Sequence, residues 1–225
     1  MMQVVIVANA PQFDATPFRD LLARADLVIA ADGGGNALHA INVAPHVVIG
    51  DLDSLTPAAE AFAVAAGAAI IRHPPEKDEI DLELALLHAV QCGADHIDIL
   101  GAIGGRWDQS LANVALLALP ELQSCRVRLL DVDQEAFLVR VHLTIIGTPG
   151  DTVSLLPIGG AAHGITTVGL QYALTNASLS FERTRGVSNV ITGVPAEVSL
   201  REGMLLVIRQ WSGAEVRSKG GSPTG

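Results

Sequence analysis

Two aspartates that are two residues apart, Asp51 and Asp53, follow a short run of β-branched residues in the segment HVVIGDLDS. In an extended loop, side chains at this spacing point to the same side of the chain. Two carboxylates about 4 Å apart repel each other by about 4 kcal/mol at an effective dielectric constant of about 20. A divalent cation removes that repulsion, and Mg²⁺ prefers oxygen ligands. The pair therefore predicts a magnesium site; capping of the next helix by Asp53 or Ser54 is the alternative.

A second acidic segment, EKDEIDLE, begins at Glu76 and runs into the first turn of an expected helix. Negative charge is favourable at the start of any helix, so solvation alone explains several of these residues. Asp78 and Asp81, however, are three residues apart and share one face of the first turn. We expect both to lie beside the aspartate pair and to complete the magnesium site. Lys77 is then placed to meet a phosphate as a point charge.

Two glycine-rich loops, ADGGGN at 31–36 and GAIGGRWDQ at 101–109, each follow an expected strand and precede an expected helix. Glycine lets the backbone approach a ligand closely, and the free N–H groups of a helix start attract anions. The first loop therefore predicts a close approach of the backbone to a ligand, and the second predicts a clamp for phosphate and ribose. A tight turn without ligand is the alternative for the first loop. For the second, it is an Arg106–Asp108 pair that closes the loop, with Trp107 packed as a lid.

These segments need a scaffold that brings them to one edge. Short β-branched runs alternate with helical patterns in the first half of the chain, which predicts an α/β domain with a largely parallel, buried sheet. In such a sheet, ligands bind beyond the carboxyl ends of the strands. Thr16 and Thr56 each precede a proline and are expected to cap helices. We expect strands at 4–7, 27–30, 47–49, 69–71 and 97–100, and helices at 81–91 and 110–117.

The sequence changes character after about residue 120. Short apolar runs, the first of them VRLLDV from Arg126, are separated at close intervals by turn glycines up to residue 209. That pattern is typical of an antiparallel sandwich or barrel. We divide the chain into an α/β domain at 1–135, a second domain at 136–212 and a disordered tail at 213–225.

Composition excludes several functions. The net charge is −10, and no basic stripe with interleaved aromatic residues is present, which argues against a nucleic-acid partner. The N-terminal segment lacks a signal-peptide pattern and no apolar run is long enough to span a bilayer, so no membrane is expected. Cys92 and Cys125 lack metal-ligand spacing and are expected to be two buried thiols in the reducing cytoplasm. Neither a Walker A motif nor a nucleophile elbow occurs.

Taken in order, ADGGGNAL, GDLDS, EKDEIDLELAL and GAIGGRWDQSLANVALL resemble the motifs of the thiamine diphosphokinase (thiamin pyrophosphokinase) family. The stretch GLQYAL…RGVSNV is similar to the thiamine-binding domain of that family, and the resemblance runs from about 27 to 208. It implies a Rossmann-like three-layer α/β domain that binds nucleotide and metal, followed by a thiamine-binding antiparallel β-sandwich. It also implies Mg²⁺-dependent transfer of diphosphate from ATP to the hydroxyl of thiamine, which gives thiamine diphosphate and AMP. Similar members are homodimers with thiamine held between subunits.

The resemblance also assigns residues. Asp51, Asp53 and Asp81 would hold Mg²⁺ and, with Asp78 and Arg106, would form the catalytic set. Ser188 and Asn189 would face thiamine. The ATP site would be lined by Asp32, Gly33, Gly34, Lys77, Gly105, Arg106, Asp108 and Gln109.

Two positions depart from the family pattern. Ile80 stands where the family usually has threonine, and the final strand lacks the tryptophan that some relatives stack on thiamine, since Trp211 comes slightly later. Two other functions stay open at this point. One is a different Mg²⁺-dependent nucleotide kinase or a phosphohydrolase that uses the same aspartates. The other is a non-catalytic nucleotide- or thiamine-binding protein, although such a binder has no need for clustered carboxylates.

Overall fold

The structure is a computed structural model, and it describes residues 1–213. Within them the chain forms two units, residues 1–131 and residues 132–213, each described here by itself. The expected tail at 213–225 lies outside the described residues except for Gly213. The division of functions at 135/136 stays a prediction.

The first unit is built on a parallel sheet with the strand order β6-β5-β1-β2-β3-β4. All the strands expected in the first half of the chain are confirmed. β6 corrects the prediction, because its residues were grouped with the antiparallel runs yet pair in parallel with β5. A run of β-branched residues indicates a strand but not whether that strand pairs in parallel or antiparallel. The strands are β1 (Gln3–Val7), β2 (Leu27–Ala31), β3 (Val47–Gly50), β4 (Ala69–Arg72), β5 (His96–Leu100) and β6 (Arg126–Leu130).

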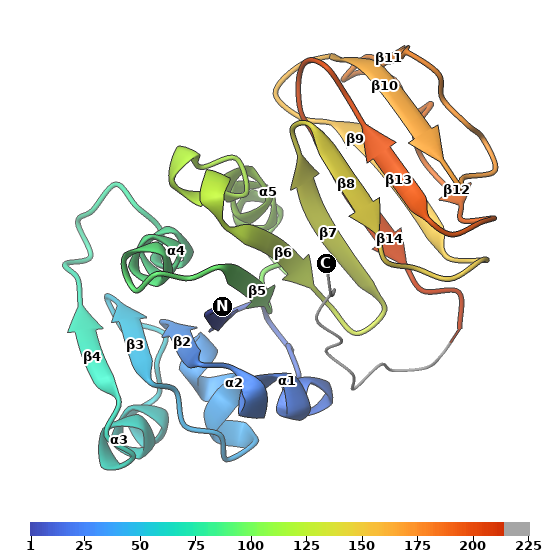
Figure 1. The fold of residues 1–225 in the computed structure, drawn as a ribbon. Helices are drawn as coiled ribbons and strands as arrows, with labels where there is room; N and C mark the ends of the chain where they lie inside the picture. The colour runs from blue at the N-terminus through green and yellow to red at the C-terminus, as the bar shows by residue number, and fades with distance from the viewer. Residues whose placement is uncertain (214–225) are drawn as a thin grey trace. The chain divides into compact units, whose positions relative to one another are not determined.

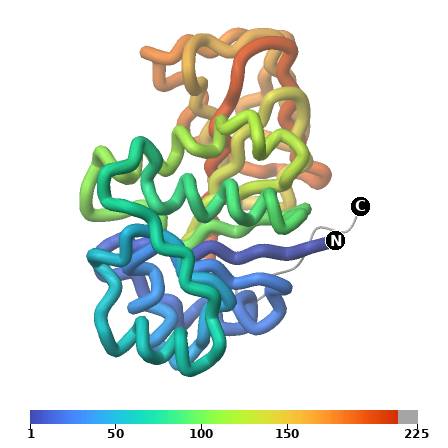
Figure 2. Tube along the Cα trace, turned by 90° about the vertical axis from the view of Figure 1, so that its left-hand side faces the viewer, coloured from blue at the N-terminus to red at the C-terminus, as the bar shows by residue number. Residues whose placement is uncertain are grey.

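Helices cover both faces of this sheet, with α1–α3 on one side and α4 on the other (Figures 1 and 2). The expected helix at 81–91 matches α4, whereas α5 begins three residues before the expected Ser110. Thr56 caps α3 as expected, accepting from the N–H of Ala59, but Thr16 lies inside a 3-10 turn and caps nothing. The helical elements are η1 (Thr16–Phe18), α1 (Arg19–Arg24), α2 (Gly34–Ala40), α3 (Pro57–Ala65), α4 (Asp81–Gln91), α5 (Trp107–Leu116) and η2 (Pro120–Ser124).

The core of the first unit is aliphatic. Val5, Val28 and Val48 of the central strands are fully or almost fully buried and pack with Leu38 of α2 and Leu22 of α1. Burial of an aliphatic side chain of this size contributes about 1.5–3 kcal/mol, so this packing supplies much of the stability. The sheet is thereby held rigid beneath the loops at its carboxyl ends.

The second unit is an antiparallel β-sandwich, which confirms the predicted fold class. One sheet has the order β12-β9-β14-β7 and the other β11-β10-β13-β8. Val153 and Leu205 of the first sheet meet Ile165 and Val198 of the second in one buried cluster. The strands are β7 (Gln134–Val139), β8 (His142–Ile145), β9 (Thr152–Pro157), β10 (Ala162–Val168), β11 (Ala177–Leu179), β12 (Asn189–Val190), β13 (Ala196–Ser199) and β14 (Leu205–Gln210).

Within residues 1–213, no helix has the length and apolar character needed to cross a membrane. Both cysteines are free thiols. Cys125 is partly buried, but Cys92 is exposed, so the expectation of two buried thiols was wrong for Cys92. Cys92 is the C-cap residue that follows the last residue of α4, Gln91.

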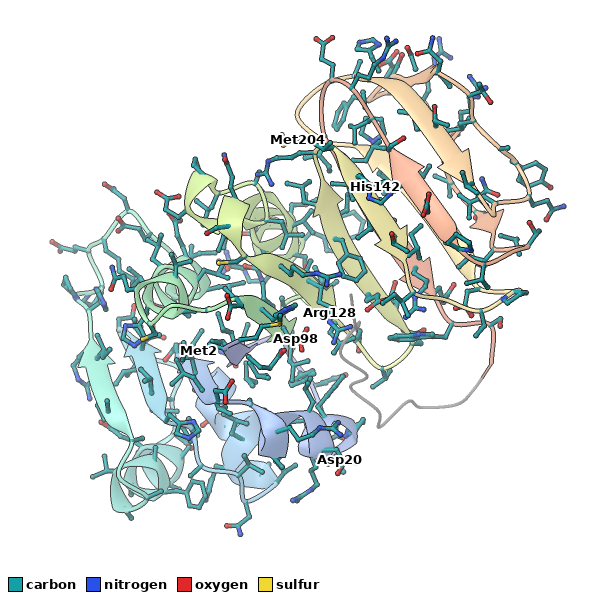
Figure 3. The ribbon with its side chains drawn as sticks, viewed as in Figure 1. Met2, Asp20, Asp98, Arg128, His142 and Met204 are labelled. Atoms are coloured by element: carbon teal, nitrogen blue, oxygen red, sulfur yellow. The ribbon has the colours of Figure 1, made fainter. Side chains whose placement is uncertain are left out.

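Each unit contains a buried carboxylate that is paired with an arginine. In the first, Asp98 of β5 and Arg128 of β6 point toward each other and form an ion pair (Figure 3). In the second, the Arg209 guanidinium lies 2.6 Å from Glu135 Oε1 and 3.5 Å from Asp151 Oδ2. Burial acts to raise the pKa of Asp151. Hydrogen bonds from the N–H groups of Thr148 and Ser212 and the Arg209 charge outweigh burial, so this pKa lies below its usual value.

We expect Arg209→Met to lower the free energy of unfolding by about 3–5 kcal/mol, because it removes the guanidinium that lies between two buried carboxylates. Arg183→Met is the matched control, since the Arg183 side chain is 79% exposed and, among residues 1–213, forms an ion pair with its neighbour Glu182 at 3.9 Å. The control should shift stability by no more than about 0.5 kcal/mol. Urea unfolding of the three proteins measures both values. Equal stability of the two variants would show that the buried pairs contribute nothing.

Candidate functional site

All four chemistry-bearing segments of the first unit lie at the carboxyl edge of the parallel sheet. They follow β2, β3 and β5 or begin α4. The strand order reverses between β1 and β5, because later strands extend outward on both sides of this pair. Such a switch point opens a crevice outside the carboxyl ends of the two strands, where α/β proteins bind ligands.

Two glycines allow the elements of this edge to touch. A Cβ atom on Gly34 would lie 2.0 Å from the carbonyl oxygen of Val7, so the start of α2 packs directly on the end of β1. Gly50 has a φ of +145°, and a Cβ there would lie 2.8 Å from Asp81 Oδ1. Only glycine fits at both positions. The ends of β1 and β3 are thus brought against α2 and α4.

Three carboxylates converge at this edge. Asp32, Asp51 and Asp53 each offer one oxygen, and these oxygens lie within 4.8 Å of one another. Asp32 is 5% exposed, and its Oδ1 has no hydrogen-bond partner among the described residues. A buried, unpartnered carboxylate oxygen beside two others fits a hard cation, for which oxygen is the preferred ligand. The sequence predicted Asp51 and Asp53 for this set but assigned Asp32 to ATP.

Lys77 links the three carboxylates to Asp81. Its Nζ lies 2.9 Å from Asp81 Oδ1 and 3.6 Å from Asp51 Oδ2, and its side chain is only 11% exposed. Burial acts to lower the pKa of Lys77, but the hydrogen bond and the charges of Asp81 and Asp51 outweigh it and raise this pKa. Asp78 is exposed and lies outside the three-carboxylate cluster. The metal roles of Asp81 and Asp78 stay predictions.

The electrostatics of the cluster act most strongly on Asp32. Burial raises the pKa of its carboxyl group, while the Gly33 N–H and the Ser54 hydroxyl oppose this by donating hydrogen bonds. The charges of Asp81 and Asp53 raise the pKa further, and the net shift is upward. The Asp32 carboxylate is therefore destabilised at neutral pH until a cation compensates it.

The aspartate loop after β3 is held in place by Asn36, whose part the sequence did not reveal. The Asn36 side-chain nitrogen donates to the carbonyl of Ser54 at 2.9 Å. Its Oδ1 accepts from the N–H and the hydroxyl of Thr56 at 2.9 and 2.8 Å. Asn36 is part of the glycine-rich loop ADGGGN, but nothing in its spacing indicates that it bridges to residues 54–56.

The loop after β5 carries the remaining nucleotide-site predictions. Arg106 donates to both carboxylate oxygens of Asp108, at 3.1 and 2.5 Å, and both side chains are about two-thirds exposed. This pair matches the structural alternative considered for the loop, but Trp107 is 85% exposed and does not pack as a lid. Gln109 is also exposed. The nucleotide roles of these residues stay predictions.

A residue that the sequence analysis missed is Asn9, at the carboxyl end of β1. A Cβ on Gly33 would lie 2.4 Å from the Asn9 side-chain amide, so Asn9 covers that glycine. The Ala10 N–H donates to the Gly101 carbonyl at 2.9 Å. The loop after β1 therefore contacts the loops after both β2 and β5. The position of Asn9 just after the first expected strand of an α/β pattern is the signal that could have revealed it.

The predicted thiamine residues lie in the second unit. Ser188 is exposed and has a φ of +60°. Asn189 is buried, and its amide bonds to both the N–H and the carbonyl of Tyr172, at 2.9 and 2.8 Å. Trp211 lies against Arg209, with 5.3 Å between the guanidinium carbon and the ring centre. Of these side chains, Ser188 is the one that is open to a ligand in the described structure.

Comparison with known proteins decides the family. The model of the thiamin pyrophosphokinase catalytic domain matches residues 18–129, and that of the thiamin pyrophosphokinase vitamin B1 binding domain matches residues 140–205. The chain belongs to the thiamin pyrophosphokinase family. This confirms the resemblance on which the sequence analysis relied.

Similar members of the thiamin pyrophosphokinase family come from distant organisms. A thiamine pyrophosphokinase of Bacillus subtilis (strain 168) is 29% identical over 222 residues, 93% of this chain and 99% of that protein. Thiamine pyrophosphokinase 3 of Oryza sativa subsp. japonica is 30% identical over 194 residues, covering 75% of this chain and 72% of that one. A crystal structure of thiamine pyrophosphokinase from Bacillus subtilis aligns with a TM-score of 0.80 and 28% identity, over 92% and 98% of the two chains. Neither alternative function is favoured by these matches.

The departure at Ile80 leads to a stability prediction. Ile80 is the N-cap of α4 with φ −77° and ψ 159°, the backbone geometry of a capping residue, but it forms no side-chain cap. We expect Ile80→Thr to be more stable than Ile80→Val by about 1 kcal/mol, because the threonine hydroxyl can accept from the N–H of Glu83. Valine has the same shape without the hydroxyl, so it is the matched control. Urea unfolding measures the difference, and equal midpoints would contradict the prediction.

The raised pKa of Asp32 gives a prediction for pH dependence. Its folded-state pKa lies above its unfolded value, so the contribution of Asp32 to stability falls as pH rises from about 4 through the folded value and stays lower above it. Asp32→Asn removes this loss. In EDTA we expect the variant to unfold at higher urea than wild type at pH 7, and the difference to shrink as pH falls toward 4. The exposed Asp20→Asn is the control for charge removal; a pH-independent effect of Asp32→Asn would contradict the prediction.

Proposed function

We propose that the protein transfers a diphosphate group from ATP to the hydroxyl of thiamine, giving thiamine diphosphate and AMP. The observation that carries this proposal is the convergence of Asp32, Asp51 and Asp53 beside the buried ammonium of Lys77. In a protein with a net charge of −10, such a site lets a divalent cation and an ammonium neutralise a triphosphate locally. Its relatives are named for this activity.

Mg²⁺ fits the donor set, because Asp51 and Asp53 offer clustered carboxylate oxygens and Asp32 adds a buried one without a partner. When bound, Mg²⁺ supplies charge neutralisation and orientation of the phosphates. Asp81 belongs to the same acidic group through its ion pair with Lys77. Asp51, Asp53 and Asp81 are the proposed ligands from the sequence, and Asp32 is the addition that the geometry supports.

The remaining residues of this chain position the nucleotide and offset negative charge. Phosphoryl transfer needs little covalent help from a protein, so positioning and electrostatics carry it. The backbone of Gly33, Gly34 and Gly105 approaches the phosphates, and Arg106 and Lys77 face charge that develops on the transferred or departing oxygens. Asp108 and Gln109 line the nucleotide site beside Arg106. The exposed Asp78 is the proposed acceptor of the hydroxyl proton.

The second unit is proposed to bind thiamine. The family model that covers residues 140–205 is described as a vitamin B1 binding domain, and the exposed Ser188 lies inside that range. We also propose a homodimer in the cytoplasm, in which one subunit's sandwich closes the catalytic edge of the other. Apolar side chains that a second copy would cover are exposed in each unit, including Trp107 at 85% and Phe181 at 66%. The mass in sedimentation equilibrium tests the dimer.

Phosphorus NMR of the protein with MgATP and thiamine tests the activity directly. The proposal requires that AMP and thiamine diphosphate appear together in equal amounts and that neither forms without thiamine. Formation of ADP would point to an ordinary kinase. Release of phosphate without an acceptor would point to a phosphohydrolase. Either result would overturn the proposed function.

We expect Asp53→Asn to lower kcat by about a thousandfold, equivalent to about 4 kcal/mol of transition-state stabilisation, because a metal-binding carboxylate is lost. The fold should stay intact, since Asp53 is exposed and its hydrogen bonds in the described part of the chain lie within its own loop. Asp20→Asn removes an exposed carboxylate from α1 and should keep wild-type kcat. AMP formation and circular dichroism measure both points. A near-normal rate for Asp53→Asn would show that the metal assignment is wrong.

A further inference from the structure

Lys77 has an unusual setting for a lysine. The chain has two lysines, Lys77 and Lys219, and Lys77 is the one within residues 1–213. Lysine side chains are normally solvated, because a buried ammonium loses hydration and a long side chain loses freedom when it is ordered. The Lys77 side chain is nevertheless 11% exposed, and its Nζ lies between Asp81 at 2.9 Å and Asp51 at 3.6 Å.

Asp51 is part of both the Lys77 ion pair and the cluster of three carboxylates. Its Oδ2 faces the Lys77 ammonium, while one of its oxygens also lies within 4.8 Å of oxygens from Asp32 and Asp53. A divalent cation that uses Asp51 therefore arrives next to an existing positive charge. The two cations repel each other across a few ångströms in a partly buried site. Cation binding and the Lys77 ion pairs thus compete for the same carboxylates.

A triphosphate offers Lys77 another partner. The side chain has four flexible carbons and a compact ammonium, so Nζ can change partners by side-chain rotation alone. Its backbone lies outside helices and strands, in the segment between β4 and α4. A phosphate bound beside the cluster would replace the carboxylates as the counter-charge of Lys77. The carboxylates would then be free for the cation.

We propose that Lys77 is a built-in competitor of the metal, which keeps the affinity of the free protein for divalent cations low and couples cation entry to nucleotide binding. The inference rests on the proposed function, because it takes the same site to bind a metal and a nucleotide. It assigns Lys77 a positioning role before the reaction, in addition to its contact with phosphate. The free site, with Asp32, Asp51, Asp53 and Asp81 around one ammonium, stays assembled without holding a metal tightly.

The test measures Mn²⁺ binding by electron paramagnetic resonance in wild type, Lys77→Met and Arg72→Met, all without nucleotide. We expect Lys77→Met to bind Mn²⁺ about tenfold more tightly than wild type. Arg72→Met removes a nearby cation that pairs instead with Glu60 at 2.7 Å, and it should bind Mn²⁺ as wild type does. An ATP analogue with a non-cleavable bridge between its α- and β-phosphates is then added. It should increase Mn²⁺ affinity about tenfold more in wild type than in Lys77→Met.

The outcomes separate this inference from the proposed function. The proposed competition is wrong if Lys77→Met binds Mn²⁺ no more tightly than wild type does. It is also wrong if neither protein binds Mn²⁺ detectably. Circular dichroism checks folding, and Lys77→Gln, which keeps a hydrogen-bond donor without the charge, should reproduce the tighter binding. If wild type forms AMP and thiamine diphosphate but the affinities do not change, only the inference fails. If Lys77→Met binds Mn²⁺ more tightly but wild type forms no AMP, the proposed function fails and the competition stands.

Discussion

Repulsion between carboxylates is the main physical constraint at the carboxyl edge of the parallel sheet. Asp32, Asp51 and Asp53 bring their oxygens within 4.8 Å of one another, and Asp81 adds a fourth negative charge nearby. In the described structure Lys77 offsets part of this charge by pairing with Asp51 and Asp81. Burial raises the pKa of Asp32, and the charges of Asp81 and Asp53 add to that increase. Such a site has a standing attraction for cations, and what binds there changes its electrostatics.

Two glycines allow close contacts around the aspartates. Gly34 lets α2 start against the end of β1, and Gly50 lets β3 end against the first residue of α4. Asn36 then fixes the aspartate loop through three hydrogen bonds to residues 54–56. The buried aliphatic sheet below holds these contacts in register. Rigid positioning of this kind is what phosphoryl transfer requires from a protein.

The second unit also contains buried charged side chains, which lie within its apolar sandwich. Arg209 is placed between Glu135 and Asp151, and the hydrogen bonds at Asp151 also tie the chain after β14 to the loop before β9. Asn189 is likewise committed to the backbone of Tyr172, which leaves Ser188 exposed at the neighbouring position. The buried polar side chains named here fix loops, whereas Ser188 is exposed to solvent.

The sequence by itself indicated the strands up to β5, helix α4 and the family. β-branched runs located the strands up to β5, helical periodicity located α4, and four motifs in order placed the site at the carboxyl edge, because parallel strands direct their ends to one side. Only the tertiary structure brought Asp32 to Asp51 and Asp53, paired Lys77 with two aspartates, turned Trp107 outward and joined β6 to the parallel sheet. The reason is that local propensity acts over a few residues. Contacts between distant loops depend on strand register and on how closely two backbones can approach. No single segment of the sequence determines either property.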